Sequence, residues 1–349
     1  MSRIDTDRGE HAKSARPASV RRVTMADVAA HANVDRAVVS KVLSNDPTLN
    51  IRDDTRQRVL QAVEALRYRP NAVARGLRTA RAGAFGLVIP DFSNPAFTEI
   101  IAGAELAAAR HRSVLLTSSA ATFAVDQYVD LLEPGRVDGL LLTNIVLDAH
   151  TVERLQRLNV PWLILNYQDP DHQRYLILDD EHAAILAMQH LISLGHRRIA
   201  HLAGPKSNDT SRRRAGYFAA LSDAGISHDP HLLVETTLTS AGGADAMRTL
   251  LTQPDPPTAV FIVNLTTAIG ALSSARQLGW KIPNNLSAIA VHDLPLAAYL
   301  EPPLTTVRMP LSELGRRGIE ILVTAPDTIA EVITSPIELV LRGSTGPPK

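Results

Sequence analysis

The segment from Val23 to Leu43 constrains the fold most, because it reads as two short helices joined by a tight turn. Thr24 can cap the first helix, and Asp35 can cap the second. Asn33 suits the turn, since asparagine tolerates a positive φ better than most residues. Each helix has an apolar side, formed by Val28, Ala29 and Ala32 in the first and by Val39, Val42 and Leu43 in the second. The pattern therefore predicts a helix-turn-helix.

The second helix should point polar and small residues outward, namely Arg36, Ala37, Ser40 and Lys41. A short helix with arginine and lysine near its start is what readout of the DNA major groove requires. We expect these four residues and Thr24 to contact DNA. The alternative is an ordinary two-helix corner with a solvated, charged face.

Further segments support the DNA-binding interpretation. They run from Thr55 to Thr79, from Gly86 to Phe97, from Leu194 to Pro205 (L-G-H-R-R-I-A-H-L-A-G-P) and from Pro303 to Arg308 (P-L-T-T-V-R). With these motifs in this order, nearly everything after residue 22 resembles the lactose-repressor (LacI/GalR) family. The resemblance implies a transcriptional regulator, expected to be a repressor. Such a protein binds a pseudo-palindromic double-stranded DNA operator as a homodimer, under the control of a sugar-like or related small-molecule effector.

The pattern after residue 83 changes to short apolar runs, such as Ala84–Ile89 and Ala259–Val263, which alternate with amphipathic helical stretches. Such alternation predicts doubly wound parallel sheets. The expected fold is a small all-α helix-turn-helix head and an α/β periplasmic-binding-protein-like body of two doubly wound parallel-sheet subdomains, the likeness to periplasmic binding proteins being implied by the resemblance.

Four segments are expected along the chain. They are a disordered basic tail (1–22), a helix-turn-helix domain (23–69), a hinge helix or linker (70–82) and an effector-binding and dimerisation domain (83–349). Within the last we expect one subdomain at about 84–166 and 293–323, and the other at about 167–291 and 326–342. The crossovers would lie near 166–167, 292–293 and 323–325.

The formal net charge of zero hides a segregation of charge. Residues 1–82 hold 16 Lys+Arg against 9 Asp+Glu, whereas residues 83–349 hold 20 against 27. A basic head on an acidic body is typical of a phosphate-binding module joined to a regulatory domain. The chain has no cysteine, no apolar run long enough to span a membrane and no apolar core of a secretory signal near its start. We expect a cytoplasmic, nucleoid-associated protein.

The resemblance also assigns residues to the hinge. It implies that Asn71, Arg75, Leu77 and Arg78 contact DNA, with Leu77 as an apolar wedge in the minor groove. The alternative is a flexible basic linker.

Ligands of open α/β sheets bind beyond the carboxyl ends of the strands. That rule and the resemblance together nominate an effector site made of Ala96, Phe97, Asn144, Arg212, Asn264 and His292. The arginine is Arg212 when counted from Gly204, but the position becomes Ser211 when counted back from Gly216. Arg213 or Arg214 would then be structural or solvated.

His292 stands where the family has an aspartate. A neutral histidine offers one donor and one acceptor, whereas a charged one offers two donors and could suit a more acidic effector. The alternative role for His292 is to hold a subdomain crossover. Asp179, Asp180 and Glu181 are interpreted as charges that cap a helix.

Two other protein classes are kept as alternatives, a solute-binding receptor and an enzyme on the same α/β body. No catalytic motif is recognised, and we predict no catalytic residue, cofactor or metal ion, since His190, His196 and His201 are spread over different elements. The C-terminal S-T-G-P-P-K is expected to be disordered, which makes tetramerisation through a coiled-coil tail unexpected.

Overall fold

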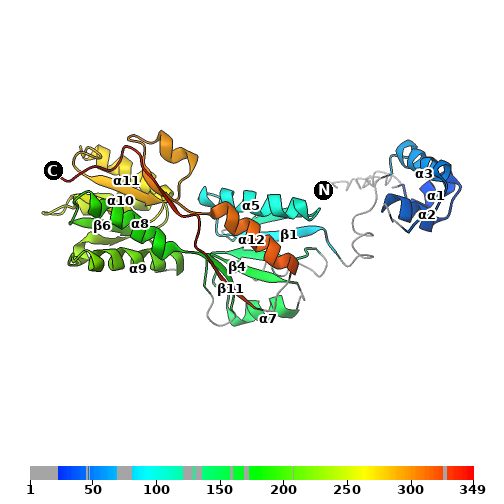
Figure 1. Cartoon of the computed structure of the whole chain (residues 1–349), viewed down its shortest axis with the longest axis horizontal. Coiled ribbons are helices and arrows are strands. Elements are labelled where there is room, and N and C mark those ends of the chain that lie inside the picture. Colours follow the sequence, from blue (N-terminus) through cyan, green and yellow to red (C-terminus); the bar gives the residue numbers. More distant parts are fainter. Residues whose placement is uncertain are drawn as a thin grey trace, which may run out of the picture. The chain divides into compact units, whose positions relative to one another are not determined.

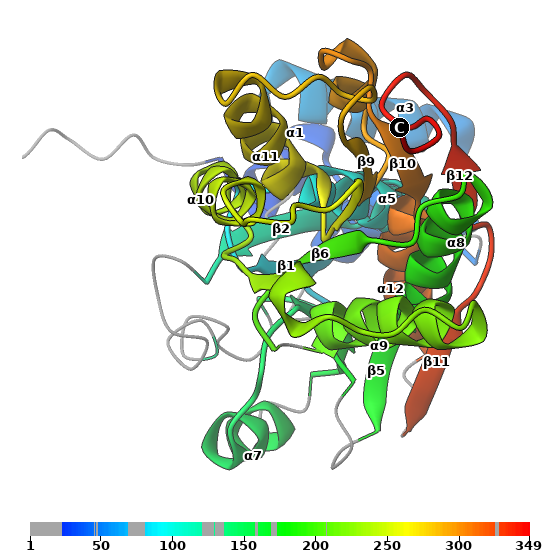
Figure 2. The ribbon, with the colours of Figure 1, turned by 90° about the vertical axis from the view of Figure 1, so that its left-hand side faces the viewer.

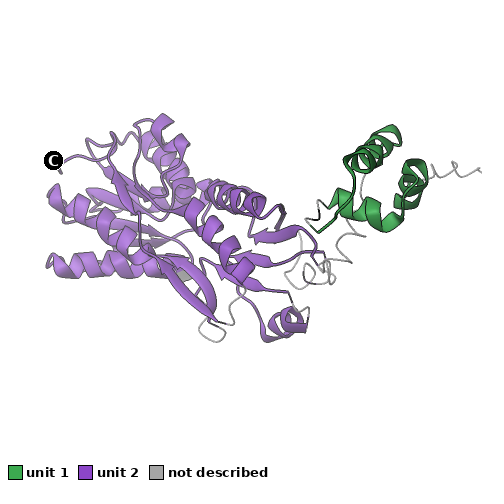
Figure 3. Ribbon diagram, turned by 45° about the vertical axis from the view of Figure 1, so that its right-hand side comes forward, with its two compact units in different colours: residues 1–78 green, residues 79–349 purple. Residues whose placement is uncertain are grey.

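The computed structural model describes residues 23–44, 46, 48–68, 81–120, 129, 136–157, 160–168, 173–206, 208–324 and 328–349. The chain divides into two compact units, residues 1–78 and 79–349 (Figure 3). The tail predicted at 1–22 lies outside the described residues. The same holds for the predicted hinge contacts Asn71, Arg75, Leu77 and Arg78.

Three helices form the described part of the first unit: α1 (Met25–Ala32), α2 (Arg36–Leu43) and α3 (Asp53–Ala65). Their small core gathers Val28, Val39 and Val59, which are fully buried, with alanines between them. α3 begins without a side-chain cap, because Arg52 occupies the N-cap position. The helix-turn-helix predicted for this region is confirmed.

The second unit contains two six-stranded sheets. The first has the order β11-β5-β4-β3-β1-β2, and all its strand pairs are parallel. Its strands are β1 (Ala84–Ile89), β2 (Val114–Ser119), β3 (Leu140–Thr143), β4 (Trp162–Leu165), β5 (Arg174–Leu178) and β11 (Ile329–Ile333). α5 (Ala96–Arg110) and α12 (Leu311–Thr324) lie side by side over one face of the sheet (Figure 1). α7 (Ala149–Arg157) follows β3.

The second sheet repeats this topology in the order β12-β10-β9-β8-β6-β7, with only β12 antiparallel to its neighbour. Its strands are β6 (Ile199–Ala203), β7 (Leu233–Glu235), β8 (Ala259–Ile262), β9 (Ser287–Val291), β10 (Thr305–Arg308) and β12 (Glu338–Val340). The helices are α8 (Asp180–Ser193), α9 (Asn208–Asp223), α10 (Ser240–Leu251) and α11 (Leu265–Gln277), with short 3₁₀ turns at η1 (Pro230–Leu232) and η2 (Pro295–Tyr299). Figure 2 shows α8 beside α9 and α10 beside α11, and these pairs cover opposite faces of the sheet in Figure 1. Two doubly wound sheets are thus confirmed.

The crossovers predicted near 166–167, 292–293 and 323–325 are wrong. The chain changes sheets between β5 and α8, between β10 and α12, and between β11 and β12. β5 therefore belongs to the first subdomain and β10 to the second, contrary to the predicted boundaries. The physical reason is that both strands give a weak sequence signal: the interior strand β5 begins with two partly exposed residues, and the edge strand β11 alternates between partly exposed and exposed residues.

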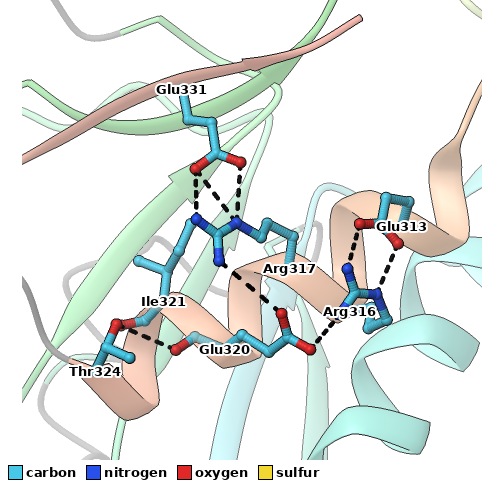
Figure 4. A network of polar contacts seen from close by, with 7 residues as sticks. All are labelled: Glu313, Arg316, Arg317, Glu320, Ile321, Thr324 and Glu331. Atoms are coloured by element: carbon cyan, nitrogen blue, oxygen red, sulfur yellow. Dashed lines mark hydrogen bonds and ion pairs between the residues drawn. The ribbon is translucent and has the colours of Figure 1, made fainter. Parts of the chain in front are cut away.

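Ion pairs connect α12 to its surroundings (Figure 4). Arg316 lies between Glu313 and Glu320, one turn away on either side. Arg317 reaches β11, where its Nη2 atom donates to Glu331 Oε2 at 2.8 Å. The pair between Arg317 and Glu331 thus connects α12 to strand β11, which follows it in the chain.

The C-terminal segment is ordered, contrary to our expectation. Ser344 is fully buried, donates to the Ala288 carbonyl at 2.6 Å and accepts from the Thr305 amide at 2.7 Å. His196 also contacts the C-terminal segment, since its Nε2 atom lies 2.8 Å from the Gly346 carbonyl oxygen. A serine, a threonine and a glycine look like a loose tail, but here Ser344 satisfies backbone groups near the starts of the interior strands β9 and β10.

Candidate DNA interface and effector cleft

The local geometry of the helix-turn-helix follows from four polar residues. Thr24 and Asp27 form a capping box at the start of α1, with the Thr24 amide donating to Asp27 Oδ2 at 2.8 Å. Asn33 adopts the left-handed conformation with φ of 50°, as the turn was expected to require. Asp35 caps α2 by accepting from the Ala37 amide at 2.6 Å. The predicted caps and turn are confirmed.

α2 presents one side to the core and the other outward. Val39 and Val42 are buried, whereas Arg36, Ala37 and Lys41 are exposed. Ser40 is half-buried between these two sides. Thr24, the remaining residue predicted to meet DNA in this unit, is exposed at the start of α1, although its hydroxyl also donates to Asp27. The unit thus has a cationic outward helix face of the kind that enters a major groove.

In the second unit, polar residues follow the buried strands at one edge of each sheet. Asn144 follows β3 and Asn166 follows β4, both with positive φ, and Asn166 Nδ2 lies 3.4 Å from Asn144 Oδ1. Ala96 and Phe97 open α5 at the same edge and are buried. These positions agree with the rule that ligand sites lie beyond the carboxyl ends of parallel strands.

The corresponding edge of the second sheet holds Asn264 and His292. Asn264 caps α11, and its Oδ1 atom accepts from the Thr267 amide at 2.8 Å. The two subdomains approach one another here, since Thr266 Oγ1 lies 3.5 Å from Asn94 Oδ1. Both edges therefore border one cleft.

A buried ion-pair cluster lies beneath this edge. Arg213 is almost fully buried; its Nε atom donates to Asp180 Oδ1 at 3.0 Å and its Nη1 atom to the Val263 carbonyl at 2.9 Å. Arg212 donates to the other oxygen of Asp180 at 2.6 Å. Burial raises the pKa of the Asp180 carboxyl, and the two guanidinium groups oppose that rise.

His292 completes the cluster. Arg213 Nη2 lies 3.2 Å from His292 Nε2, and because a guanidinium can only donate, this histidine nitrogen must accept. Burial and the nearby Arg213 lower the pKa of His292 well below its ordinary value. The imidazole is therefore neutral, which removes the two-donor form considered from the sequence. Its amide donates to the Val307 carbonyl of β10, close to the crossover from β10 to α12, so its alternative role of holding a crossover stays a prediction.

A cavity of about 550 Å³ opens between the two subdomains, and of the six residues predicted to bind the effector only Arg212 lines it. It is lined by Val146, Tyr167, Gln168, Lys206, Ser211, Arg212 and Ala215. Both candidates for the effector-binding position, Arg212 and Ser211, thus face the same cavity on the first turns of α9. Arg213 is not among the residues that line the cavity, and the structural role expected for Arg213 or Arg214 stays a prediction.

Comparisons with known proteins decide the family. Residues 24–71 match "Bacterial regulatory proteins, lacI family", and residues 188–345 match "Periplasmic binding protein-like domain". The chain is 34% identical over 331 residues to the HTH-type transcriptional repressor CytR of Escherichia coli K12, covering 92% of this chain and 96% of that repressor. The chain belongs to the LacI family.

Solved LacI-family structures agree with this assignment. The lac repressor dimer bound to operator and the anti-inducer ONPF superposes with a TM-score of 0.83 at 27% identity, covering 93% of this chain and all of that one. The CelR–cellobiose complex gives a TM-score of 0.70 at 28% identity, with the same 93% and 100% coverage. The chain is thus a DNA-binding transcriptional regulator, and its relatives are repressors, not enzymes or solute receptors.

Two functional features of this LacI-family chain escaped the sequence reasoning. Asp180 was interpreted as a capping charge, but the cap is Asp179, which accepts from the His182 amide at 3.0 Å, while Asp180 is buried against two arginines. Asn166 was considered only as part of a predicted crossover and not as a residue of the effector site. The available signal was the run Arg212 to Arg214, because successive side chains on a helix point about 100° apart. Arg213 is the one that faces inward, and its buried charge is paired with Asp180.

Among the described residues, no group of three or more histidine, cysteine or acidic side chains is placed to hold a metal ion. None of the helices in the described ranges is long and apolar enough to cross a bilayer.

Proposed function

We propose that two copies of this LacI-family regulator read a pseudo-palindromic operator through the outward side of α2. Arg36, Ala37, Ser40 and Lys41 would meet base edges or phosphates, and Thr24 would contact the backbone of the DNA. The observation that carries this proposal is the exposure of Arg36 and Lys41 on a helix whose opposite side is buried.

Asn71, Arg75, Leu77 and Arg78 would extend the contact into the minor groove, with Leu77 as the wedge. The protein would act as a homodimer and a repressor on the nucleoid, in the cytoplasm. The lac repressor dimer solved on its operator supports this arrangement by similarity.

A small molecule in the cleft would control operator affinity. We propose that it contacts Ala96, Phe97, Asn144, Arg212, Asn264 and His292, which come from both subdomains. Binding between the two subdomains would change how they close, and hence the affinity of the dimer for DNA. The CelR structure with cellobiose supports an effector in a cleft of this kind.

The test is the Lys41→Ala variant, with DNA affinity measured on an operator selected from random oligonucleotides and on unselected DNA. We expect a loss of about 1–3 kcal/mol on the operator alone, because a lysine that reads a base contributes to discrimination. Arg157→Ala, in the second unit, is the control. An equal loss on both DNAs would reassign Lys41 to a phosphate, and a protein that selects no sequence at all would refute the proposed function.

A further inference from the structure

The cavity at the cleft has a lining that predicts the charge of its ligand. We infer that the effector is a small anion, a phosphate ester or a carboxylic acid, which also carries at least one hydrogen-bond donor. This inference rests on the proposed function, because it names the chemical class that the effector cleft accepts.

The first argument is the chemistry of the lining. Lys206 and Arg212 bring two cationic groups to the cavity, and Ser211, Tyr167 and Gln168 bring hydroxyl and amide donors. None of the seven described lining residues is acidic. A cavity of about 550 Å³ lies within the range of small-ligand sites, so one metabolite-sized anion fits it.

The second argument is the balance of charge behind the lining. Lys206, Arg212 and Arg213 outnumber the two buried acids in the first turns of α8 and α9, Asp180 and Asp209, so at least one positive charge is in excess even when both carboxyls are ionised. Arg214 does not change this net charge, because it forms an ion pair with Glu235. His292 contributes no charge, and the start of α9 adds the positive end of a helix dipole. A neutral ligand that closed the cleft would bury this excess without a counter-charge, which is costly.

The third argument is an unsatisfied acceptor. Asn166 precedes the lining residue Tyr167 and is only 6% exposed. Its Oδ1 atom accepts no hydrogen bond from the described residues, whereas its Nδ2 atom donates to Asn144. Buried acceptors are seldom left without a donor. A hydroxyl of the effector would satisfy it.

The experiment measures ligand binding by calorimetry on the full-length protein in the absence of DNA. Three probe comparisons separate charge from shape and phosphate from carboxylate: glucose 6-phosphate against glucose, ribose 5-phosphate against ribose, and gluconate against glucose. We expect at least one anion to bind about tenfold or more tightly than its neutral partner, and to weaken as salt is raised, because the attraction is electrostatic.

Variants then locate the site. Arg212→Gln and Lys206→Gln should each weaken anion binding about tenfold, whereas Arg157→Gln, which removes an exposed arginine on α7, should not. Lys206 is exposed, so its variant retains the fold even if Arg212→Gln is destabilised.

Three outcomes would overturn the inference: neutral sugars that bind as tightly as their anions, anion binding that neither variant weakens, or no binding of any anion. Operator selection is measured separately and without ligand. A protein that binds anions but selects no DNA would refute only the proposed function.

Discussion

At the scale of single residues, three neighbouring arginines have three different environments. Arg212 lines the cavity, with its side chain 16% exposed. Arg213 is buried against Asp180, Val263 and His292. Arg214 pairs with Glu235 at 3.0 Å. Helical periodicity separates the three side chains, so substitution of each should have a different consequence.

Arg213→Met should destabilise the protein by about 3–5 kcal/mol, because the buried carboxylate of Asp180 would keep only one of its two cations. The Val263 carbonyl and the His292 imidazole would each also lose a hydrogen-bond donor. Urea denaturation measures this loss. Arg248→Met, which breaks an exposed pair with Asp245 on α10, should cost less than about 1 kcal/mol. A similar small loss in both variants would show that the buried cluster does not stabilise the fold.

At the scale of elements, glycines set the closest helix contact in the first subdomain. A Cβ atom added at Gly103 of α5 would lie 1.8 Å from the Ser312 carbonyl oxygen of α12. The reciprocal position, Gly315 of α12, would meet the Ile100 carbonyl at 1.9 Å. The obstructing atoms belong to backbone, which cannot move aside as a flexible side chain can.

Gly103→Ala should therefore lower the free energy of unfolding by about 1–3 kcal/mol through overpacking, even though alanine favours a helix more than glycine does. Thermal and urea unfolding would measure the change. Gly343→Ala serves as the control, because the nearest atom to its added Cβ, in Pro302, would be 3.6 Å away. A Gly103 variant as stable as the parent would mean that the two helices can separate without cost.

At the scale of the whole molecule, regulation requires the two units to be thermodynamically coupled. The helix-turn-helix unit carries the proposed DNA contacts and the α/β unit the proposed effector contacts. If an effector changes operator affinity by some factor, then the operator must change effector affinity by the same factor.

We therefore expect equal and reciprocal shifts when the dissociation constant for operator is measured with and without effector, and that for effector with and without operator. Fluorescence anisotropy and calorimetry give the two values. A protein in which effector binding leaves operator affinity unchanged would bind both ligands without regulation, and the proposed control by a small molecule would be wrong.

Much of the secondary structure could be predicted from the sequence. The buried strand Ala84–Ile89 is found with the bounds expected, and most other apolar runs became strands within a residue or two. The strands β5, β10, β11 and β12 were missed, and the subdomain boundaries with them. β11 and β12 are edge strands, which need no continuous apolar run. β5 and β10 are interior strands, but β5 begins with an arginine and β10 reads T-T-V-R, so neither is a wholly apolar segment.

The sequence by itself determined the helix-turn-helix, since Thr24, Asn33 and Asp35 act on backbone groups only a few residues away. Local interactions of this kind need no knowledge of the rest of the chain. Only the tertiary structure decided that Asp180, Arg213 and His292 meet. Arg213 is 33 residues from one partner and 79 from the other. Their contact depends on how α9 packs against α8 and how α8 packs against β9, an arrangement that no periodic pattern in the sequence specifies.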